Sequence, residues 1–492
     1  MALSDSSSPV PIRRSWRGPG VLVAVAIAIL VVATTAGSLR DLDVFWHVRL
    51  GGELLDGVSI YDAGRDWSYA PVEYSWVSTQ WIVEIVFSWL NSAAGFTGLV
   101  GFRVATTAAA LASVLFVLLR DRQNRTWAIL TAYLASAFTL FVFAQDRPQQ
   151  ISFVLLPIVG WWWIRLIRDA RIPSWWLLLL VSAVWANSHG LWIMIPVALA
   201  LGIAGRFLDH GLSDSTSRKA GWALLAALVG GSITPIGPLN LLAPLRFAET
   251  TRHIVEWDPT NFVSLVSLGL TFTLILLVFT WARGGARPCR SEVLFVAAIA
   301  LFGATAARNI APAVLVLGPL MAWRLSASFA GPSPRPMSVA LASFAKPATG
   351  FLLAFGALIG IVAVSSSDPI PPESRPVGLV TQIAEREQPS RVLNGYNVSG
   401  LVLWFARPEV SRNVVLVGID GRADLYGAGY IDEYLAMERG EPGWDETIAQ
   451  LNPNIALLPR SGAVVELLMD RGWTEIGNEA DYVLLLPPGD GR

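Results

Sequence analysis

The chain has 492 residues, of which 53% are hydrophobic and only 15% are charged, and its mean hydropathy is +0.52. Ordinary soluble domains carry about 25% charged residues, so this composition excludes an ordinary soluble protein and indicates a polytopic membrane protein. The formal net charge of −1 gives no electrostatic basis for nucleic-acid binding, and the single Cys289 excludes an intrachain disulfide or a cysteine metal cluster.

Apolar segments recur along most of the chain, and a bilayer-spanning helix needs roughly 20 such residues. We predict about eleven spans, at 19–37, 98–119, 127–144, 149–167, 174–187, 191–206, 219–236, 262–282, 291–307, 310–324 and 347–366. Segments 174–187 and 310–324 are short and are expected to be broken helices or to end inside the protein. The first span has no clear cleavage site after it, which favours an uncleaved anchor over a signal peptide.

Arginine placement predicts the orientation of these spans. With the N-terminus in the cytoplasm, the cytoplasmic segments hold eighteen Lys and Arg residues, and the outer loops up to residue 346 hold seven, or eight if Arg103 snorkels outward. Since the number of spans is odd, the C-terminus is then outside. Arginine dominates over lysine, which occurs only as Lys219 and Lys346, and this bias is typical of a GC-rich bacterial genome. We therefore expect a multi-pass protein of the bacterial cell membrane.

The loop after the first span, residues 38–97, is long enough to be functional in its own right. Within it, Trp76, Trp81 and Trp89 alternate with polar residues such as Glu84. This mixture predicts amphipathic helices at the membrane interface, with the tryptophans at the depth of the lipid headgroups.

The character of the sequence changes after residue 366. A Pro/Ser-rich stretch is followed by short apolar runs, at 391–396, 413–420, 454–459 and 482–487, which alternate with helix-like stretches at 376–387, 429–439 and 461–471. Such alternation predicts a small α/β domain outside the membrane. The fold class expected is thus mainly α, divided into a cytoplasmic tail (1–18), a transmembrane bundle (19–366), a linker (367–390) and an extracytoplasmic α/β domain (391–492).

Two carboxylates and an imidazole follow the first span directly, in Asp41-Leu-Asp-Val-Phe-Trp-His47. On a helix, Asp43 and His47 share a face; in an extended segment, Asp41 and Asp43 would share a side. These three residues are the candidate catalytic groups, with a carboxylate as general base on a hydroxyl group. Alternatively, Asp41 and Asp43 hold a divalent cation beside a phosphate, or one of them only caps the next helix.

Further polar residues lie at the outward-facing ends of other spans, where charges usually line a cavity or a pathway. Arg147 and Arg308 are candidate phosphate binders, because a guanidinium matches phosphate oxygens in a bidentate way; the alternative is a salt bridge to a neighbour such as Asp146 or Glu256. The remaining candidates for substrate binding are Asn187, His189 and Glu256. His189 is equally consistent with a base, a phosphate donor or a structural hydrogen-bond partner.

One motif in the tail, Asp420-Gly-Arg-Ala-Asp424, has two interpretations. It is consistent with a site for a sugar or an acceptor. It is also typical of a tight turn after the apolar run 413–419, where Asp-Gly is common. The turn is the favoured interpretation.

The chain resembles the GT-C superfamily of polytopic glycosyltransferases, which use polyprenyl-phosphate-linked sugars. The resemblance covers nearly the whole chain and rests on Asp41-Leu-Asp-Val-Phe-Trp-His47, Gly51 or Gly52, Asp66-Trp-Ser-Tyr69, Trp76, Gln80-Trp81, Arg147-Pro148, Trp185-Ala-Asn-Ser-His-Gly190, Thr234-Pro-Ile-Gly237, Glu256-Trp257, Arg308, Asn394-Gly-Tyr396 and Asp420-Gly-Arg-Ala-Asp-Leu-Tyr426. It implies that Asp41 or Asp43 is the general base or helps to bind a metal. Many similar proteins have proline between the two acids, where this chain has Leu42, so which acid is catalytic stays open.

The function expected is transfer of a sugar, a hexose or a pentose, from a polyprenyl-phosphate donor to an envelope glycan, lipid or protein on the outer face. No cofactor is expected with certainty, and a divalent cation is possible. The alternatives are a transporter or flippase of a lipid-linked substrate, and a non-enzymatic membrane scaffold. A transporter is less consistent with the sequence, because its polar groups would lie at the bilayer midplane and in repeated halves, whereas here they gather at one surface and no repeat is visible.

Overall fold

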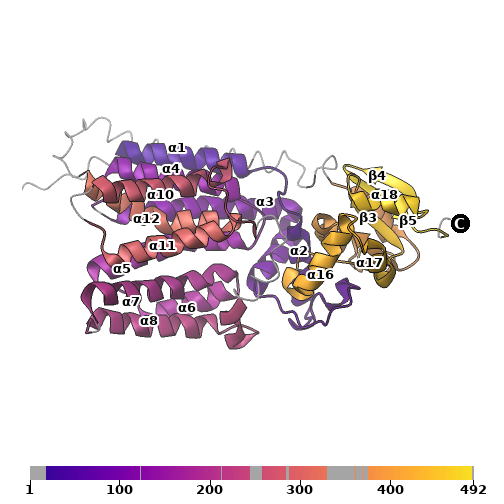
Figure 1. Ribbon diagram of the computed structural model, residues 1–492, viewed down its shortest axis with the longest axis horizontal. Coiled ribbons are helices and arrows are strands. Elements are labelled where there is room, and N and C mark those ends of the chain that lie inside the picture. Colours follow the sequence, from indigo (N-terminus) through magenta and orange to yellow (C-terminus); the bar gives the residue numbers. More distant parts are fainter. Residues whose placement is uncertain are drawn as a thin grey trace, which may run out of the picture.

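The computed structural model describes residues 18–121, 123–211, 213–243, 257–283, 287–329, 361, 370 and 375–489. Figure 1 shows a helical bundle that makes up most of the molecule and an α/β domain at the other end of its long axis, with helix α2 between them. The helices of the bundle are α1 (Gly18–Thr35), α3 (Trp81–Arg120), α4 (Thr126–Phe143), α5 (Gln149–Asp169), α6 (Trp175–Ala186), α7 (Met194–His210), α8 (Ser215–Gly231), α10 (Leu268–Arg283), α11 (Arg290–Thr305) and α12 (Ile310–Ser328).

Each predicted span that lies within the described residues coincides with a helix of this bundle. In the described part of the chain, six helical segments are long and apolar enough to cross a membrane, and α1 and α6 are shorter apolar helices. The protein is therefore a multi-pass membrane protein. The span predicted at 347–366 lies outside the described residues, apart from residue 361, so the number of spans stays a prediction.

The two spans that looked short in the sequence differ in the structure. Helix α6 is indeed short, with 12 residues. The segment at 310–324, in contrast, is part of a helical segment of 22 residues, Ala307–Ser328, and 89% of its most apolar window is buried. A helix that is apolar all round belongs in the interior, and α12 packs there against α4, α5 and α10. At Gly160 on α5, an added Cβ would lie 2.1 Å from the carbonyl oxygen of Val316, so glycine permits this close crossing.

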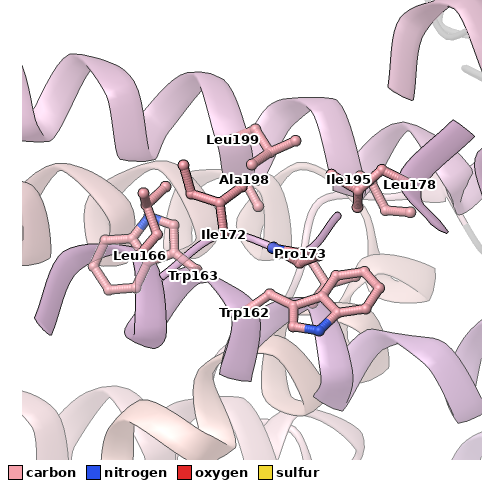
Figure 2. Close-up of a pocket in the computed structure, with 10 residues that line it drawn as sticks. Trp162, Trp163, Leu166, Ile172, Pro173, Leu178, Ile195, Ala198 and Leu199 are labelled. Carbon is pink, nitrogen blue, oxygen red and sulfur yellow. The ribbon is translucent and has the colours of Figure 1, made fainter. Parts of the chain in front are cut away.

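A small apolar pocket lies between α5, α6 and α7 (Figure 2). Its walls include the indole rings of Trp162 and Trp163 and the side chains of Leu178 and Ile195. The volume is about 10 Å³, roughly the space of one water molecule, and the walls offer almost no polar groups to hold a water. This pocket is a packing gap inside the bundle and provides no site for chemistry.

The α/β domain contains a five-stranded sheet with the order β2-β1-β3-β5-β4. Strands β1 (Ser390–Asn394), β2 (Val415–Val417) and β3 (Ile455–Pro459) are parallel, and β5 (Tyr482–Leu486) and β4 (Thr474–Glu479) continue the sheet in antiparallel pairing. Its helices are α14 (Val377–Glu385), α15 (Ser399–Phe405), α16 (Ala423–Glu438), α17 (Trp444–Leu451) and α18 (Ala463–Asp470). Helix α14 lies in the range predicted as a linker and contributes to the domain's core.

The first outer loop folds together with the α/β domain. Its helix α2 (Asp43–Leu55) packs against α15, and its residues share one buried apolar cluster with the domain. Ser68 pairs with Val417 in a parallel bridge, and the backbone N–H of Tyr69 donates to the carbonyl of Val417 at 3.1 Å. Trp76, expected at headgroup depth, is instead 8% exposed within this shared cluster. That expectation is wrong because the sequence alone did not reveal the domain as a packing partner.

Helix α3 carries the chain from the outer loop into the bundle and is kinked at Ala94 and Gly95. Just beyond this kink, Arg103 is fully buried and does not snorkel outward, so it is not an eighth basic residue of the outer loops. Its guanidinium donates to the carbonyls of Thr35, the last residue of α1, and of Gly37 and Ser38 after it. It also forms an ion pair with Asp146 at 2.5 Å. The carbonyl groups at the end of a helix need such donors. Asp146 also accepts the backbone N–H of Arg40 at 2.7 Å, so the pair fixes the segment that leads to Asp41.

Replacement of Arg103 by methionine should destabilise the protein strongly, by about 3–5 kcal/mol, because Asp146 would be left as a buried carboxylate without its partner. The midpoint of thermal unfolding in detergent measures this effect. As a control, Arg439→Ala removes an ion pair with Glu441 in which both side chains are about half exposed, and such pairs contribute little. Equal midpoints for the two variants would contradict the structural role of Arg103.

Candidate functional site

The two predicted catalytic carboxylates meet at the start of α2, where both bind Arg147. The Arg147 guanidinium forms an ion pair with Asp41 and donates from Nη2 to Asp43 at 3.1 Å. Asp41 also accepts the backbone N–H of Asp43 at 2.9 Å, which supports the first turn of the helix. Asp41 therefore both stabilises the start of α2 and pairs with Arg147. The side chain of Asp41 is 9% exposed and that of Asp43 is 30% exposed, so Asp43 is the more accessible base.

His47 lies one turn after Asp43 on the same helix and is held by a carboxylate of α3. Its Nδ1 lies 3.0 Å from Oε1 of Glu84, and both side chains are buried. A carboxylate at Nδ1 orients an imidazole and leaves Nε2 to act on a substrate. The helices cross in direct contact here, because an added Cβ at Gly51 would overlap the backbone carbonyl of Glu84. Glu84 is not among the site residues expected from the sequence, since 37 positions separate it from His47.

His189 lies at the end of a hydrogen-bonded chain of buried side chains. The indole N–H of Trp185 donates to Ser152 Oγ at 2.8 Å, and Ser152 Oγ lies 3.0 Å from His189 Nδ1. The backbone N–H of Leu191 also points at Nδ1, at 3.2 Å. Because a backbone amide can only donate, Nδ1 is an acceptor and the proton of the neutral ring is on Nε2. The ring is therefore a hydrogen-bond donor at Nε2 and has no basic nitrogen left for a substrate.

The charge state of His189 agrees with this assignment. Burial, followed by the positive charge of Arg308 and smaller effects of His47 and Arg147, lowers its pKa to about 3. The imidazole is therefore neutral at physiological pH. Arg308, His47 and Arg147 are thus within electrostatic range of His189, although the four residues come from four separate segments of the chain.

Arg308 stands in the short 3₁₀ helix Ala307–Asn309, directly before α12. Its guanidinium lies over the ring of Trp257, 4.5 Å from the centroid. The segment around it is fixed by backbone hydrogen bonds, from Ala307 N to the carbonyl of Asp258 at 2.9 Å and from Thr260 N to the carbonyl of Ala304 at 3.0 Å. Glu256, a candidate from the sequence, lies outside the described residues.

Asn187 is used for positioning. Its amide nitrogen donates to the carbonyls of Ala183 and Ile233 at 2.8 and 2.7 Å, and its amide oxygen accepts from the indole N–H of Trp81 at 2.6 Å. These bonds tie the ends of α6 and α8 to the start of the helix that carries Glu84. The side chain of Asn187 thus fixes the ends of α6 and α8 relative to the start of α3.

The donor set of the two acids does not match a metal site in the described part of the chain. Asp41 and Asp43 are both paired with Arg147, and among the described residues no group of three or more His, Cys, Asp or Glu side chains could hold a metal ion. A divalent cation prefers six or more oxygen ligands and would have to displace the guanidinium.

Comparison with known proteins finds similar solved structures but no similar family model or curated protein. Among solved structures, ArnT from Cupriavidus metallidurans in the apo state has 13% identity and a TM-score of 0.50, and the match covers 94% of this chain and 97% of that one. The same protein bound to undecaprenyl phosphate has 14% identity and a TM-score of 0.49, over the same shares of the two chains. The arabinofuranosyltransferase AftD from Mycobacteria has 14% identity and a TM-score of 0.46, over 98% of this chain and 40% of that one. The chain thus has the overall fold of ArnT.

The low pKa of His189 predicts a pH dependence of stability. An unfolded histidine binds a proton below about pH 6.5, whereas the folded ring binds one only near pH 3, so the folded state should lose stability as the pH falls below about 6.5. Glutamine at position 189 cannot take up a proton, so His189→Gln should lose less thermal stability than the unaltered protein between pH 7 and pH 5. Equal losses in both proteins would show that His189 is protonated in the folded state.

Proposed function

We propose that the protein is a membrane glycosyltransferase that transfers a sugar from a polyprenyl-phosphate donor to a hydroxyl group of an envelope glycan, lipid or protein. The observation that carries the proposal is the Arg147 guanidinium that bridges Asp41 and Asp43, near the neutral imidazole of His189 and the cation of Arg308. A base beside a cluster of phosphate-binding groups is what glycosyl transfer from a lipid phosphate requires. The GT-C fold supports this reaction class.

Asp43 acts as the general base in this proposal, because its carboxylate is the more exposed of the two. The acceptor oxygen attacks the anomeric carbon of the donor sugar while its proton passes to Asp43. The bond between the anomeric carbon and the phosphate oxygen breaks, and the electron pair leaves with the lipid phosphate. The protonated Asp43 later releases its proton to water, which restores the carboxylate.

Arg147 couples the two halves of this reaction. When Asp43 takes up a proton it loses its negative charge, and its hold on the Arg147 guanidinium weakens. The same guanidinium is then available to the phosphate, on which negative charge develops at that moment. Asp41 stays ionised and keeps Arg147 in place throughout. A fixed cation of this kind stabilises the leaving group with little rearrangement.

His189 and Arg308 complete the binding of the lipid phosphate. The Nε2–H of His189 donates a hydrogen bond that does not depend on pH in the physiological range, because the ring stays neutral. Arg308 supplies a second cation, and its guanidinium is kept in place by the ring of Trp257. His47, oriented by Glu84, is placed to accept a hydrogen bond from a substrate hydroxyl.

The site faces the outside of the cell in this proposal. The α/β domain and the site lie at the same end of the bundle (Figure 1). A second, polar pocket of about 350 Å³ is lined by charged residues that the sequence analysis assigned to cytoplasmic segments, namely Arg120, Asp121, Arg165, Arg168, Asp169 and Arg171. This gathering of arginines supports the orientation that the positive-inside rule predicts.

Loss of the proposed base should abolish the product. A strain that lacks the gene should show an altered envelope glycan. A plasmid copy with Asp43→Asn should restore less than about 1% of the normal glycan, since a general base accelerates the reaction roughly 10²–10⁴-fold. Glycan profiling by mass spectrometry measures this, with immunoblotting of membranes to show that the variant inserts.

The matched control is Asp62→Asn, which removes a carboxylate from the same outer loop, where its side chain is 56% exposed in a surface ion pair with Arg65. It should restore the glycan fully. Full restoration by Asp43→Asn and also by Asp41→Asn would refute the proposed reaction. Unchanged glycans in the deletion strain, together with lost uptake of a solute, would favour a transporter.

A further inference from the structure

The polar pocket that contains Arg165 is formed by two segments of the chain that are far apart in the sequence. One segment is the end of α3 with the residues after it, and the other is the second half of α5 with the residues after it. The volume of about 350 Å³ lies within the range of sites for small ligands, roughly 300–1,000 Å³. Four arginines against two aspartates leave the lining with a net charge of +2. The pocket is therefore suited to an anion.

One of these arginines, Arg168, holds the two segments together. It forms ion pairs with Asp121 at 2.5 Å and with Asp169 at 2.9 Å, and all three nitrogens of its guanidinium donate to these two carboxylates. Asp121 follows α3 directly, and Arg168 lies in the last turn of α5. The ion pair thus fixes the ends of the two helices against each other, and a single arginine pairs with both acids of the pocket.

The other three arginines of the pocket keep their N–H groups for a ligand. Within the described part of the chain, no carboxylate lies within ion-pair distance of Arg120, Arg165 or Arg171. The guanidinium of Arg165 lies over the ring of Trp161, 4.9 Å from its centroid, and that of Arg120 lies over the ring of Phe116 at 5.6 Å. An aromatic face attracts a guanidinium and leaves N–H groups available to oxygen acceptors. Three cations are thus placed around one cavity without an anionic partner.

The pocket lies at the depth of the lipid headgroups, at the membrane surface opposite the proposed catalytic site. Helix α5 begins two residues after Arg147, and its 21 residues, roughly 30 Å in length, lead to the pocket. Two helices that begin near this end carry exposed tryptophans in their first turns, Trp127 in α4 and both Trp175 and Trp176 in α6. Exposed tryptophans at the ends of spans are typical of the interface between membrane and water. Phosphate groups of lipids are the anions present at this depth.

We propose that this pocket binds the phosphate group of an anionic phospholipid of the cytoplasmic leaflet, through the guanidinium groups of Arg120, Arg165 and Arg171. A guanidinium matches phosphate oxygens in a bidentate way, and basic pockets between transmembrane helices on the cytoplasmic side bind such headgroups. The bound phosphate connects the ends of α3 and α5, so it stabilises the folded protein. This site does not rest on the proposed glycosyl transfer.

The positive-inside rule by itself does not account for the pocket. That rule places arginines in cytoplasmic segments but does not gather them around one cavity. Arg218 and Lys219, at the start of α8, are exposed and do not line the pocket. They lie at the same end of the bundle, because Asp214, which precedes α8, pairs with Arg206, and Arg206 donates to the carbonyl of Leu166 in α5. These two residues provide a matched control.

The test titrates the purified, delipidated full chain with phosphatidylglycerol and measures binding by native mass spectrometry. The double variant Arg165→Gln/Arg171→Gln should weaken binding by about tenfold or more, since each cation near an anionic headgroup contributes roughly fivefold. Arg165→Lys/Arg171→Lys keeps both charges and should bind more tightly than the glutamine variant. The control Arg218→Gln/Lys219→Gln removes the same charge from the same end of the bundle and should bind as the unaltered protein does.

A second measurement follows stability. Without lipid, the glutamine variant should unfold at the same temperature as the control, which shows that it is folded. Phosphatidylglycerol should then raise the midpoint of thermal unfolding of the control more than that of the glutamine variant, because a ligand stabilises the state that binds it.

Two kinds of result would overturn the inference. Equal weakening of phosphatidylglycerol binding in the two glutamine variants would show that only the overall charge of this end of the bundle matters, and unweakened binding in Arg165→Gln/Arg171→Gln would exclude the pocket. Inorganic phosphate bound as tightly as phosphatidylglycerol would identify a site for a free anion instead of a lipid. Phosphatidylcholine bound as tightly would likewise exclude selection for an anionic headgroup, because its choline group cancels the charge of the phosphate.

Discussion

The buried ion pair between Arg103 and Asp146 is the constraint on which the geometry of the site depends. It closes the end of α1, where three carbonyl groups accept from Arg103, and it receives the backbone of Arg40 through Asp146. Asp41 follows Arg40 directly, and Arg147 follows Asp146. The ion pair thus fixes the backbone at Arg40 and at Asp146. The next residue of each segment, Asp41 and Arg147, is thereby placed so that the two form their own ion pair. A buried charge pair is a costly way to gain stability, but it specifies a single arrangement.

The site lies where two separately packed cores meet. One core fills the helical bundle, and the other joins the first outer loop to the α/β domain. Arg147, His189 and Arg308 come from the bundle, whereas Asp43 and His47 belong to the outer layer. In the proposed reaction, a lipid phosphate approaching from the bilayer would meet cations held by the bundle, and a water-soluble acceptor would meet the base of the outer layer. Such an arrangement would separate the two proposed substrates by their solubility.

The sequence predicted those features that depend on local pattern. Apolar length located the helices of the bundle, and alternation located most strands of the α/β domain. The motif Asp41 to His47 and the cations Arg147 and Arg308 were also recognised as site candidates. Pairing across long distances was not predictable: His47 with Glu84, Ser152 with His189, and Gly421 against Asp43 all depend on how helices cross. The burial of Arg103 was not predictable for the same reason, because its partners are the distant Asp146 and backbone carbonyls, which carry no sequence signal.

The most direct test of the account is a structure of the protein in nanodiscs with a bound polyprenyl phosphate, determined by electron cryomicroscopy. Phosphate density is expected within hydrogen-bond distance of both Arg147 and the Nε2 atom of His189, with Asp43 open to the outer aqueous side. Phosphate density at the opposite end of the bundle, among Arg120, Arg165 and Arg171, with no density near Arg147, would contradict it.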